Sequence, residues 1–414
     1  MLKKLAIRAS AVVLAVAPLA TTPPALVSAD AGTGTLFAIA ATSQTLVKVD
    51  LASGAFTQVA DLNTPNQPQS VALASDPIDH RLFLIRISVT GFDPSTGFPI
   101  FTQELLTFDS ATGAQVFNPA PAFPGIAPQS LVFDTSSRTL FGFTGLDVVT
   151  VNPATAALTK VASIASSFGG FTYSTAVDSS THTLYVAQET ENFDGTSTTA
   201  VYAVNDQTGA VAAPVTLDQG VRQIGIDSHQ VYGITECCPA NLVDINTSTG
   251  VTTFVHAVGD SSAIVQFGTA ADPATHDVFI NVGTFDPNTF NSTNELLVIN
   301  DQTGASSTLP LTDGMPSLGL AFETPAPSIT ADSIRADVRS AFGRGSIRSA
   351  GVETALLSEL NAAADARSRG QCTTAANDYQ AFINTVRAQS GKTISAATAA
   401  QLVSEARFLM ASCP

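Results

Sequence analysis

Short apolar stretches alternate with polar turns along most of this chain, and one kind of turn recurs. It consists of Asp or Asn, two variable residues, Ser or Thr, and Gly, and it follows an apolar run, as at residues 296–304. Six copies, 41 to 59 residues apart, begin at Asp50, Asp109, Asn152, Asn205, Asn246 and Asn300. Repetition at this period indicates one supersecondary unit that stacks on copies of itself.

A second signature, Leu or Val followed by an aromatic residue, precedes each turn. Its copies are Leu36-Phe37, Leu82-Phe83, Leu140-Phe141, Leu184-Tyr185, Val231-Tyr232 and Val278-Phe279. In five of the six units a further apolar stretch, ending near an Asp, lies upstream of this pair. β-Branched residues and polar turns predict strands rather than helices. Each unit is therefore predicted to hold four strands, A to D, with the Asp/Asn turn between C and D.

The turn residues have a physical reason. An Asp or Asn at the head can accept hydrogen bonds from the backbone two residues on, and Gly at the end accepts a positive φ without a Cβ clash. The third copy ends in Ala156. We expect that turn to be the most strained or differently shaped.

The first unit lacks a strand A, and an orphan strand at residues 317–323 follows the sixth unit. We expect this strand to complete the first unit and close a ring, which removes exposed sheet edges. The predicted fold is mainly β, a six-bladed β-propeller over residues 30–323. The repeat resembles those of secreted bacterial propellers of the YVTN, NHL or strictosidine-synthase-like kind.

The pattern changes after a linker at residues 324–328, which contains Pro325 and Pro327. Helical spacing over residues 329–414 predicts a small all-α domain of about four helices. The segments 356–363 and 381–392 (LLSELNAA and AFINTVRAQSGK) resemble the FIMAH-type helical module of secreted bacterial proteins. That resemblance implies an accessory or docking role. Cys372 begins the third helix and Cys413 ends the fourth, so antiparallel packing would join them in a disulfide.

Residues 1–29 carry a basic end, a short apolar core and a small-residue cleavage site, which together predict a signal peptide cleaved near Ala29. We therefore expect a protein that is secreted or at the cell surface, without a transmembrane segment in the mature chain. Residues 30–323 hold 27 acidic and six basic side chains. Such an acidic body repels phosphate backbones, so nucleic acid is not an expected partner.

The B–C connections are long in the second, fourth and sixth units, and each contains Phe-Asp, with the acids Asp93, Asp194 and Asp286. They are expected on the face that carries sites in propellers generally. These acids, with Glu104 and Glu295, are candidate oxygen ligands for calcium. The alternative is that each Asp makes a local turn bond while the Phe packs its loop onto the blade.

The fifth unit places Glu236, Cys237 and Cys238 in its B–C connection. A bond between the adjacent cysteines would form a strained, rigid ring, because neighbouring Cα atoms lie only about 3.8 Å apart. Such a ring can act as a platform for a ligand. The alternatives are two free thiols, or pairing with the other two cysteines.

Four of the five histidines, His80, His182, His229 and His276, occupy the A–B turn of their units. Spread round a ring, they are too far apart to share one metal ion. We interpret them as structural.

No catalytic motif is present. Three hypotheses follow. The first is a secreted, non-catalytic propeller that binds an extracellular protein, glycan or small molecule, with a helical docking domain. The second is a metal-dependent hydrolase of lactonase or strictosidine-synthase-like type that uses the acidic face. The third is a structural cell-surface protein.

Overall fold

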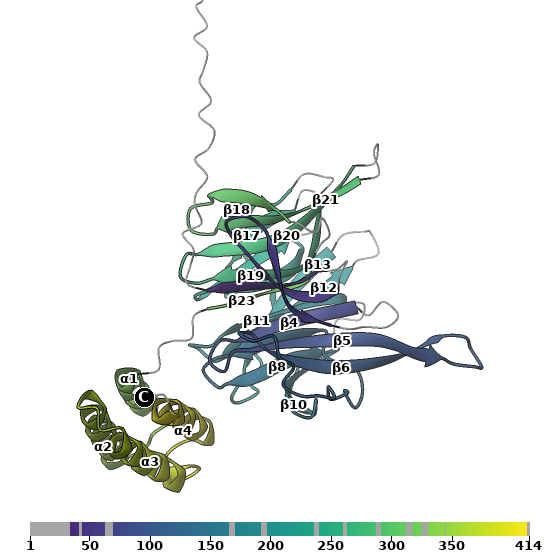
Figure 1. Cartoon of the computed structure of the whole chain (residues 1–414). Helices are drawn as coiled ribbons and strands as arrows, with labels where there is room; N and C mark the ends of the chain where they lie inside the picture. Colours follow the sequence, from purple (N-terminus) through teal and green to yellow (C-terminus); the bar gives the residue numbers. More distant parts are fainter. Residues whose placement is uncertain are drawn as a thin grey trace, which may run out of the picture.

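Six small β-sheets stand in a ring, and four helices follow them in a separate bundle (Figure 1). This computed structural model describes residues 34–40, 44–62, 69–164, 170–191, 197–235, 240–259, 263–286, 291–311, 317–324, 330–343 and 345–411. The predicted signal peptide and most of the predicted linker lie outside these residues. The mainly β fold with six blades and a small helical region is confirmed.

Each blade is an antiparallel sheet whose first strand contacts the first strands of both neighbouring blades. The blades are: blade 1, β23(Ser317–Glu323), β1(Thr35–Ala40), β2(Thr45–Val49) and β3(Phe56–Asp61); blade 2, β4(Gln69–Asp76), β5(Arg81–Phe92) and β6(Pro99–Asp109); blade 3, β7(Ser130–Asp134), β8(Thr139–Thr144), β9(Asp147–Val151) and β10(Leu158–Ser163); blade 4, β11(Gly170–Asp178), β12(Thr183–Glu191), β13(Ser197–Asn205) and β14(Val215–Thr216); blade 5, β15(Val221–Asp227), β16(Gln230–Thr235), β17(Asn241–Ile245) and β18(Thr252–Ala257); blade 6, β19(Ala263–Asp272), β20(Asp277–Asp286), β21(Asn291–Asn300) and β22(Ser306–Pro310).

Ring closure is confirmed in the register of blade 1. β23, from the far end of the propeller sequence, pairs antiparallel with β1, so that Leu36 faces Phe322 and Ala38 faces Leu320. One blade therefore contains both ends of the ring. This arrangement uses backbone groups that would otherwise form an open sheet edge.

The apolar side chains do not form one central core. They form six clusters, and each cluster contains side chains from two neighbouring blades. Each blade therefore packs one face against the blade before it and the other face against the blade after it. The cluster between blades 6 and 1 contains Phe279, Leu296, Leu36 and Leu320. Since β23 supplies Leu320, the closing strand contributes both backbone pairing and buried apolar surface.

Blade 2 departs from the four-strand prediction, because its sheet has three strands. The chain after β6 touches its edge only at two isolated bridges, Phe108–Gln115 and Glu104–Ala122. That segment contains Pro119, Pro121 and Pro124. Proline has no N–H to donate to a ladder, so a regular fourth strand cannot form there.

The recurring turns have the predicted geometry. At their heads, for example, Asp109 Oδ1 accepts the Thr112 N–H at 2.9 Å and Asn300 Oδ1 accepts the Thr303 N–H at 3.0 Å. The final glycines have φ between 68° and 77°, and Ala156 takes the same left-handed conformation with φ of 52°. The turn that ends in Ala156 was expected to differ, but its last residue has the same left-handed conformation as the glycines. The Ala156 methyl group is fully buried.

The long B–C connections are mostly strand rather than loop. β5 and β6 pair from Arg81–Asp109 out to Phe92–Pro99, with one register shift between Val89 and Gly91, and the resulting hairpin projects far from the ring (Figure 1). β20 and β21 pair from Asp277–Asn300 to Phe285–Ser292 and Asp286–Asn291 in the same way. The alternation of β-branched and polar residues beyond residue 85 extends the strands past the blade.

The C-terminal helices are α1(Ala331–Gly343), α2(Ala350–Ser368), α3(Cys372–Gln389) and α4(Ala396–Ala411). They share one apolar core, with Leu360 and Phe382 fully buried. Cys372 is disulfide-bonded. The pairing with Cys413 stays a prediction, because Cys413 lies outside the described residues. Among the described helices, none is long and apolar enough to cross a bilayer.

One buried acid in this bundle predicts a pH-dependent stability. Burial raises the pKa of Glu405 to about 7, and the negative charge of Asp337 adds to this effect. Its Oε1 accepts a hydrogen bond from Gln401 at 2.9 Å, while Oε2 has no partner. The stability that this raised pKa contributes is complete below about pH 4.5 and is lost as pH rises through 7.

Glu405→Gln removes the charge and keeps the shape. We expect it to stabilise the helical bundle at pH 8 by about 2 kcal/mol and to change little at pH 4.5. Urea unfolding followed by far-ultraviolet circular dichroism measures the difference at both pH values. An equal change at the two pH values would contradict the raised pKa.

Candidate functional site

Among the residues whose side chains the structure describes, Asp93, Glu104 and Glu295 do not belong to a group of ligand atoms that could hold a metal ion. Asp93 sits at the tip of the β5–β6 hairpin and accepts hydrogen bonds from the Ser95 hydroxyl at 2.6 Å and the Ser95 N–H at 2.7 Å. These bonds lower the pKa of Asp93. Its carboxylate therefore holds the turn, which is the local role that the sequence left open.

Of the other predicted residues, three lie in the described part of the chain and four lie outside it. Glu104 Oε2 accepts two hydrogen bonds from Arg86, at 2.6 and 2.9 Å, so a cation already occupies this carboxylate. Glu295 lies on β21 opposite Val282 and Pro310. Asp286 ends β20. Asp194, Glu236, Cys237 and Cys238 lie outside the described residues, so their roles stay predictions.

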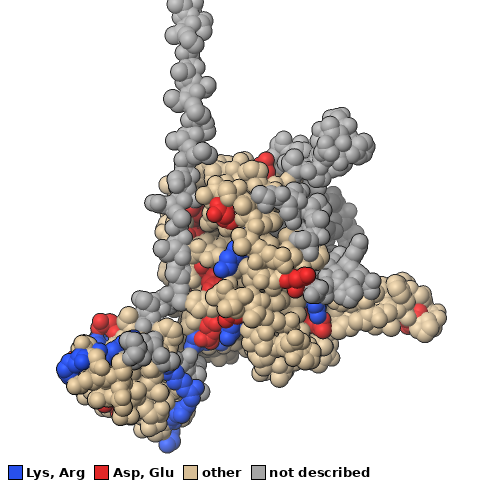
Figure 2. Space-filling view, viewed as in Figure 1, with Lys and Arg blue, Asp and Glu red and all other residues tan. Residues whose placement is uncertain are grey.

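The β5–β6 hairpin carries instead a patch of exposed apolar side chains. We call its distal part, residues 88–103, the arm. Its exposed residues include Phe92 (67%), Phe98 (72%), Ile100 (49%) and Phe101 (58%). Cross-strand pairs Val89–Phe101 and Phe92–Pro99 place four apolar residues on one face of the ribbon. Asp93 is the one charged residue in residues 88–103, and the arm is almost uncharged in Figure 2.

On the opposite side of the ring, the histidines of the A–B turns contact acids of the preceding blade. His80 Nδ1 lies 2.7 Å from Glu323 Oε1, His229 Nδ1 3.3 Å from Asp178 Oδ2, and His276 Nδ1 2.5 Å from Asp227 Oδ2. In blade 3, Arg138 holds this position and pairs with Asp79 at 3.0 Å. The histidines therefore connect neighbouring blades.

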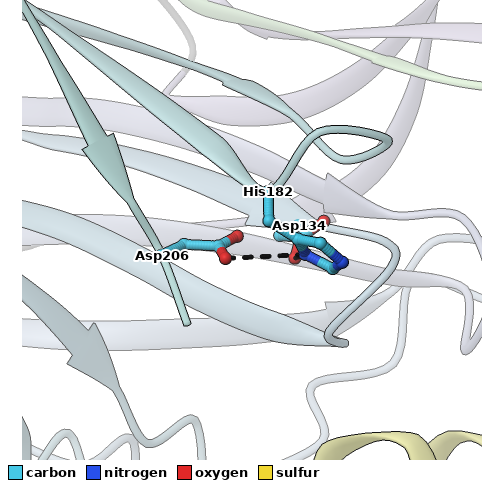
Figure 3. A group of neighbouring side chains, drawn as sticks. All are labelled: Asp134, His182 and Asp206. Carbon is cyan, nitrogen blue, oxygen red and sulfur yellow. Dashed lines mark ion pairs between the residues drawn. The ribbon is translucent and has the colours of Figure 1, made fainter. Parts of the chain in front are cut away.

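At two of these connections a second carboxylate is added. One group is Asp134, His182 and Asp206, which point toward one another in Figure 3, and the other is Asp227, His276 and Asp301. In each group the ligand atoms lie within 4.8 Å of one another. His182 Nδ1 is 3.5 Å from Asp206 Oδ1 and 3.9 Å from Asp134 Oδ2.

The elements around each group explain its geometry. The first Asp ends strand A of one blade, the His precedes strand B of the next blade, and the second Asp follows strand C of that blade. The Asp206 N–H donates to the His182 carbonyl at 3.0 Å, and the Asp301 N–H donates to the His276 carbonyl at 2.9 Å. The same backbone hydrogen bond therefore holds the second Asp next to the His in both groups.

Burial makes these carboxylates electrostatically unequal. It raises the pKa of Asp206 to about 7, and the negative charge of Asp134 adds to this. Burial also opposes ionisation of Asp134, but hydrogen bonds from Ser137, Ser179 and Ser136 outweigh it and lower its pKa. In this group Asp134, whose pKa is lowered, thus faces Asp206, whose pKa is raised.

The second group also contains a carboxylate with a raised pKa, and two other carboxylates surround it. Burial, followed by the charge of Asp227, raises the pKa of Asp301 to about 7, and Asp244 contributes further. The hydrogen bond that His276 donates to the Asp227 carboxylate raises the pKa of His276. This group attracts a proton or another cation.

Sequence reasoning missed these groups because it placed the histidines too far apart to share a metal. Two histidines are indeed too far apart to bind the same ion. The argument overlooked that each histidine can share an ion with carboxylates, one of which comes from the neighbouring blade. A signal was present: the identical turn Asn-Asp-Gln-Thr-Gly occurs at residues 205–209 and 300–304, in two units that also carry a His.

Comparisons with known proteins assign neither a family nor a function to this chain. No protein-family model and no curated protein matches the chain. Solved structures that resemble it include one from a nidogen/laminin complex (11% identity, 72% of this chain and 100% of that chain, TM-score 0.49). Others are a candidate 6-phosphogluconolactonase from Bacteroides fragilis (12%, 71% and 99%, 0.41) and an oligogalacturonate lyase from Vibrio parahaemolyticus (10%, 67% and 85%, 0.37). Identities this low carry no functional assignment, so the function is argued from the residues.

Proposed function

We propose that this chain is a secreted binding protein without a catalytic centre of its own, and that its arm captures an extracellular protein partner. The observation that carries the proposal is that exposed Phe92 and Phe101 share one face of a projecting hairpin. Contiguous exposed apolar surface on a soluble protein marks an interaction site, and aromatic residues are favoured anchors in protein interfaces.

The chemistry of the arm favours a protein partner over a glycan or a charged small molecule. A nearly uncharged apolar ribbon offers few hydrogen-bond donors to sugar hydroxyls or to an anion. It offers instead aromatic side chains that can fill apolar pockets. The rigid ring beneath the hairpin reduces the ordering cost of binding, because the strands are already paired.

The metal-dependent hydrolase hypothesis has less support from the described residues. Of its proposed ligands, Asp93 is bonded within its own turn and Glu104 is paired with Arg86. The groups of His and Asp described above lie at the A–B turns, opposite the face where the hydrolase was expected to work.

The binding proposal is tested with a double variant of the arm, Phe92→Ser with Phe101→Ser. Immobilised protein is exposed to the secreted and cell-surface proteins of the source organism, and the captured partner is purified. We expect the double variant to weaken the affinity for that partner on the order of 100-fold or more, because each anchor contributes about 2 kcal/mol. Isothermal titration calorimetry gives the affinity.

The matched control is Phe254→Ser, which removes a side chain of similar exposure (64%) from β18, away from the arm. It should bind like the unsubstituted protein. If no captured protein distinguishes the arm variant from this control, the proposal is wrong. The hypothesis of a purely structural surface protein would then be favoured.

A further inference from the structure

The two Asp-His-Asp groups contain buried carboxylates that face each other without enough hydrogen-bond donors. Asp206 is 7% exposed and neither of its oxygens accepts a hydrogen bond, so its one hydrogen-bond link is a proton shared with Asp134. Asp227 and Asp301 are 1% and 6% exposed, and each has one oxygen without a partner. Burying such acceptors is costly unless a positive charge compensates them.

The protein supplies one imidazole per group, which does not meet this need. His276 Nδ1 contacts Asp227 Oδ2, while Asp227 Oδ1 and Asp301 Oδ2 stay unpaired. The charged groups that act on Asp301 are the carboxylates of Asp227 and Asp244, and Asp272 also acts on His276. In each group the positive charge comes from the imidazole and from a proton shared by the two carboxylates, and a divalent cation can take the place of that proton.

The atoms available in each group are one imidazole nitrogen and two carboxylate oxygens. Three ligand atoms within 4.8 Å of one another surround a point about 2.8 Å from each atom, so side-chain adjustments below about 1 Å give the usual 2.0–2.2 Å. The His182 and His276 side chains are 17% and 41% exposed, so both groups lie next to solvent.

We propose that Asp134–His182–Asp206 and Asp227–His276–Asp301 are two binding sites for a divalent transition-metal ion, and that Zn²⁺ is the ion they take. An imidazole with two carboxylates suits Zn²⁺, whereas Ca²⁺ and Mg²⁺ prefer oxygen ligands only. In each site the ion links the end of strand A in one blade to strands B and C of the next. The sites therefore connect blade 3 to blade 4 and blade 5 to blade 6.

The other blade connections serve as internal references. Between blades 1 and 2, Glu323 and His80 are present, and the Ser110 N–H donates to the His80 carbonyl at 2.9 Å, but Ser110 stands where the second carboxylate would be. Between blades 4 and 5, Asp178 and His229 are present and Thr247 follows strand C. These connections should not bind the ion.

The test measures zinc per chain after the full-length protein is stripped with a chelator, reloaded with Zn²⁺ and dialysed. We expect two ions per chain, unchanged by a large excess of Ca²⁺. Asp206→Ser and Asp301→Ser, which copy the residue at the blade 1–2 connection, should each leave one ion, and the double variant none. Asp178→Ser is the matched control and should keep two.

One further measurement keeps the proposal testable if a variant folds poorly. X-ray absorption on the zinc-loaded unsubstituted protein should show nitrogen and oxygen ligands only, with about one imidazole per ion. A sulfur shell would place the zinc on cysteines and overturn the assignment. Absence of stoichiometric zinc, full displacement by Ca²⁺, or two ions retained in the double variant would each overturn it as well.

Discussion

Ending the chain after residue 316, which removes β23 and the helices, should abolish the cooperative unfolding of the propeller. Five pairings between β1 and β23 disappear, from Thr35–Glu323 to Ala40–Ser317, and so do the buried Leu320 and Ala321. Blade 1 then exposes the backbone edge of β1. The apolar clusters on both sides of β23 also lose the side chains that β23 contributes to them. Thermal unfolding should become broad, and the protein should aggregate.

The matched truncation ends the chain after Thr324. It removes the helices and leaves every residue of β23 in place, so the propeller should unfold cooperatively near the temperature of the full chain. Both truncations are compared by differential scanning calorimetry and by size-exclusion chromatography. If the two unfold alike, β23 does not close the ring, or the helices are required for the ring to fold.

The architecture was predictable from the sequence because the same turn and strand motifs recur six times, and their agreement outweighs the ambiguity of any single copy. One Asp-x-x-Thr-Gly turn is ambiguous, but six copies in register with six Leu/Val-aromatic pairs determine the number of units. Because the first unit is the one that lacks a strand A, the extra strand at residues 317–323 is expected to pair with Thr35–Ala40. The fourth strand of blade 2 was overpredicted, because three prolines interrupt a segment that still touches the edge of β6.

The candidate site was less predictable, because its residues meet through contacts between units. Asp227 and His276 are 49 residues apart, and only the packing of blade 5 on blade 6 brings them to 2.5 Å. A pattern within one unit contains no such pairing. The exposed arm was missed for a different reason: Phe92 was expected to pack on its blade, whereas the strands continue outward and carry it into solvent.

Replacing Gly113 by Ala should be among the most destabilising single substitutions in the propeller. Gly113 has a φ of 72°, and a Cβ there would come closer than 3.0 Å to the carbonyl oxygen of Val59, on the last strand of the preceding blade. The left-handed conformation alone costs an alanine about 1 kcal/mol. The backbone contact adds to this, because neither blade can move without disturbing its packing.

The same contact explains why the turn glycine recurs, beyond its conformational freedom. In blades 1, 2, 4 and 5 an added Cβ would meet a carbonyl of the preceding blade's last strand within 3.0 Å, at Gly54, Gly113, Gly209 and Gly250. Ala156 occurs in blade 3, and the blade before it has no regular fourth strand. The alanine thus stands where the neighbouring strand is missing.

Gly304→Ala separates the two effects, because Gly304 has a similar φ of 68° but a Cβ would lie 3.3 Å from the Val255 carbonyl oxygen. We expect Gly304→Ala to lower the free energy of unfolding by about 1 kcal/mol and Gly113→Ala by about 3 kcal/mol or more. Urea unfolding of both variants under one set of conditions gives the comparison. Equal losses would mean that the backbone conformation alone requires glycine, and that the packing of blade on blade does not select it.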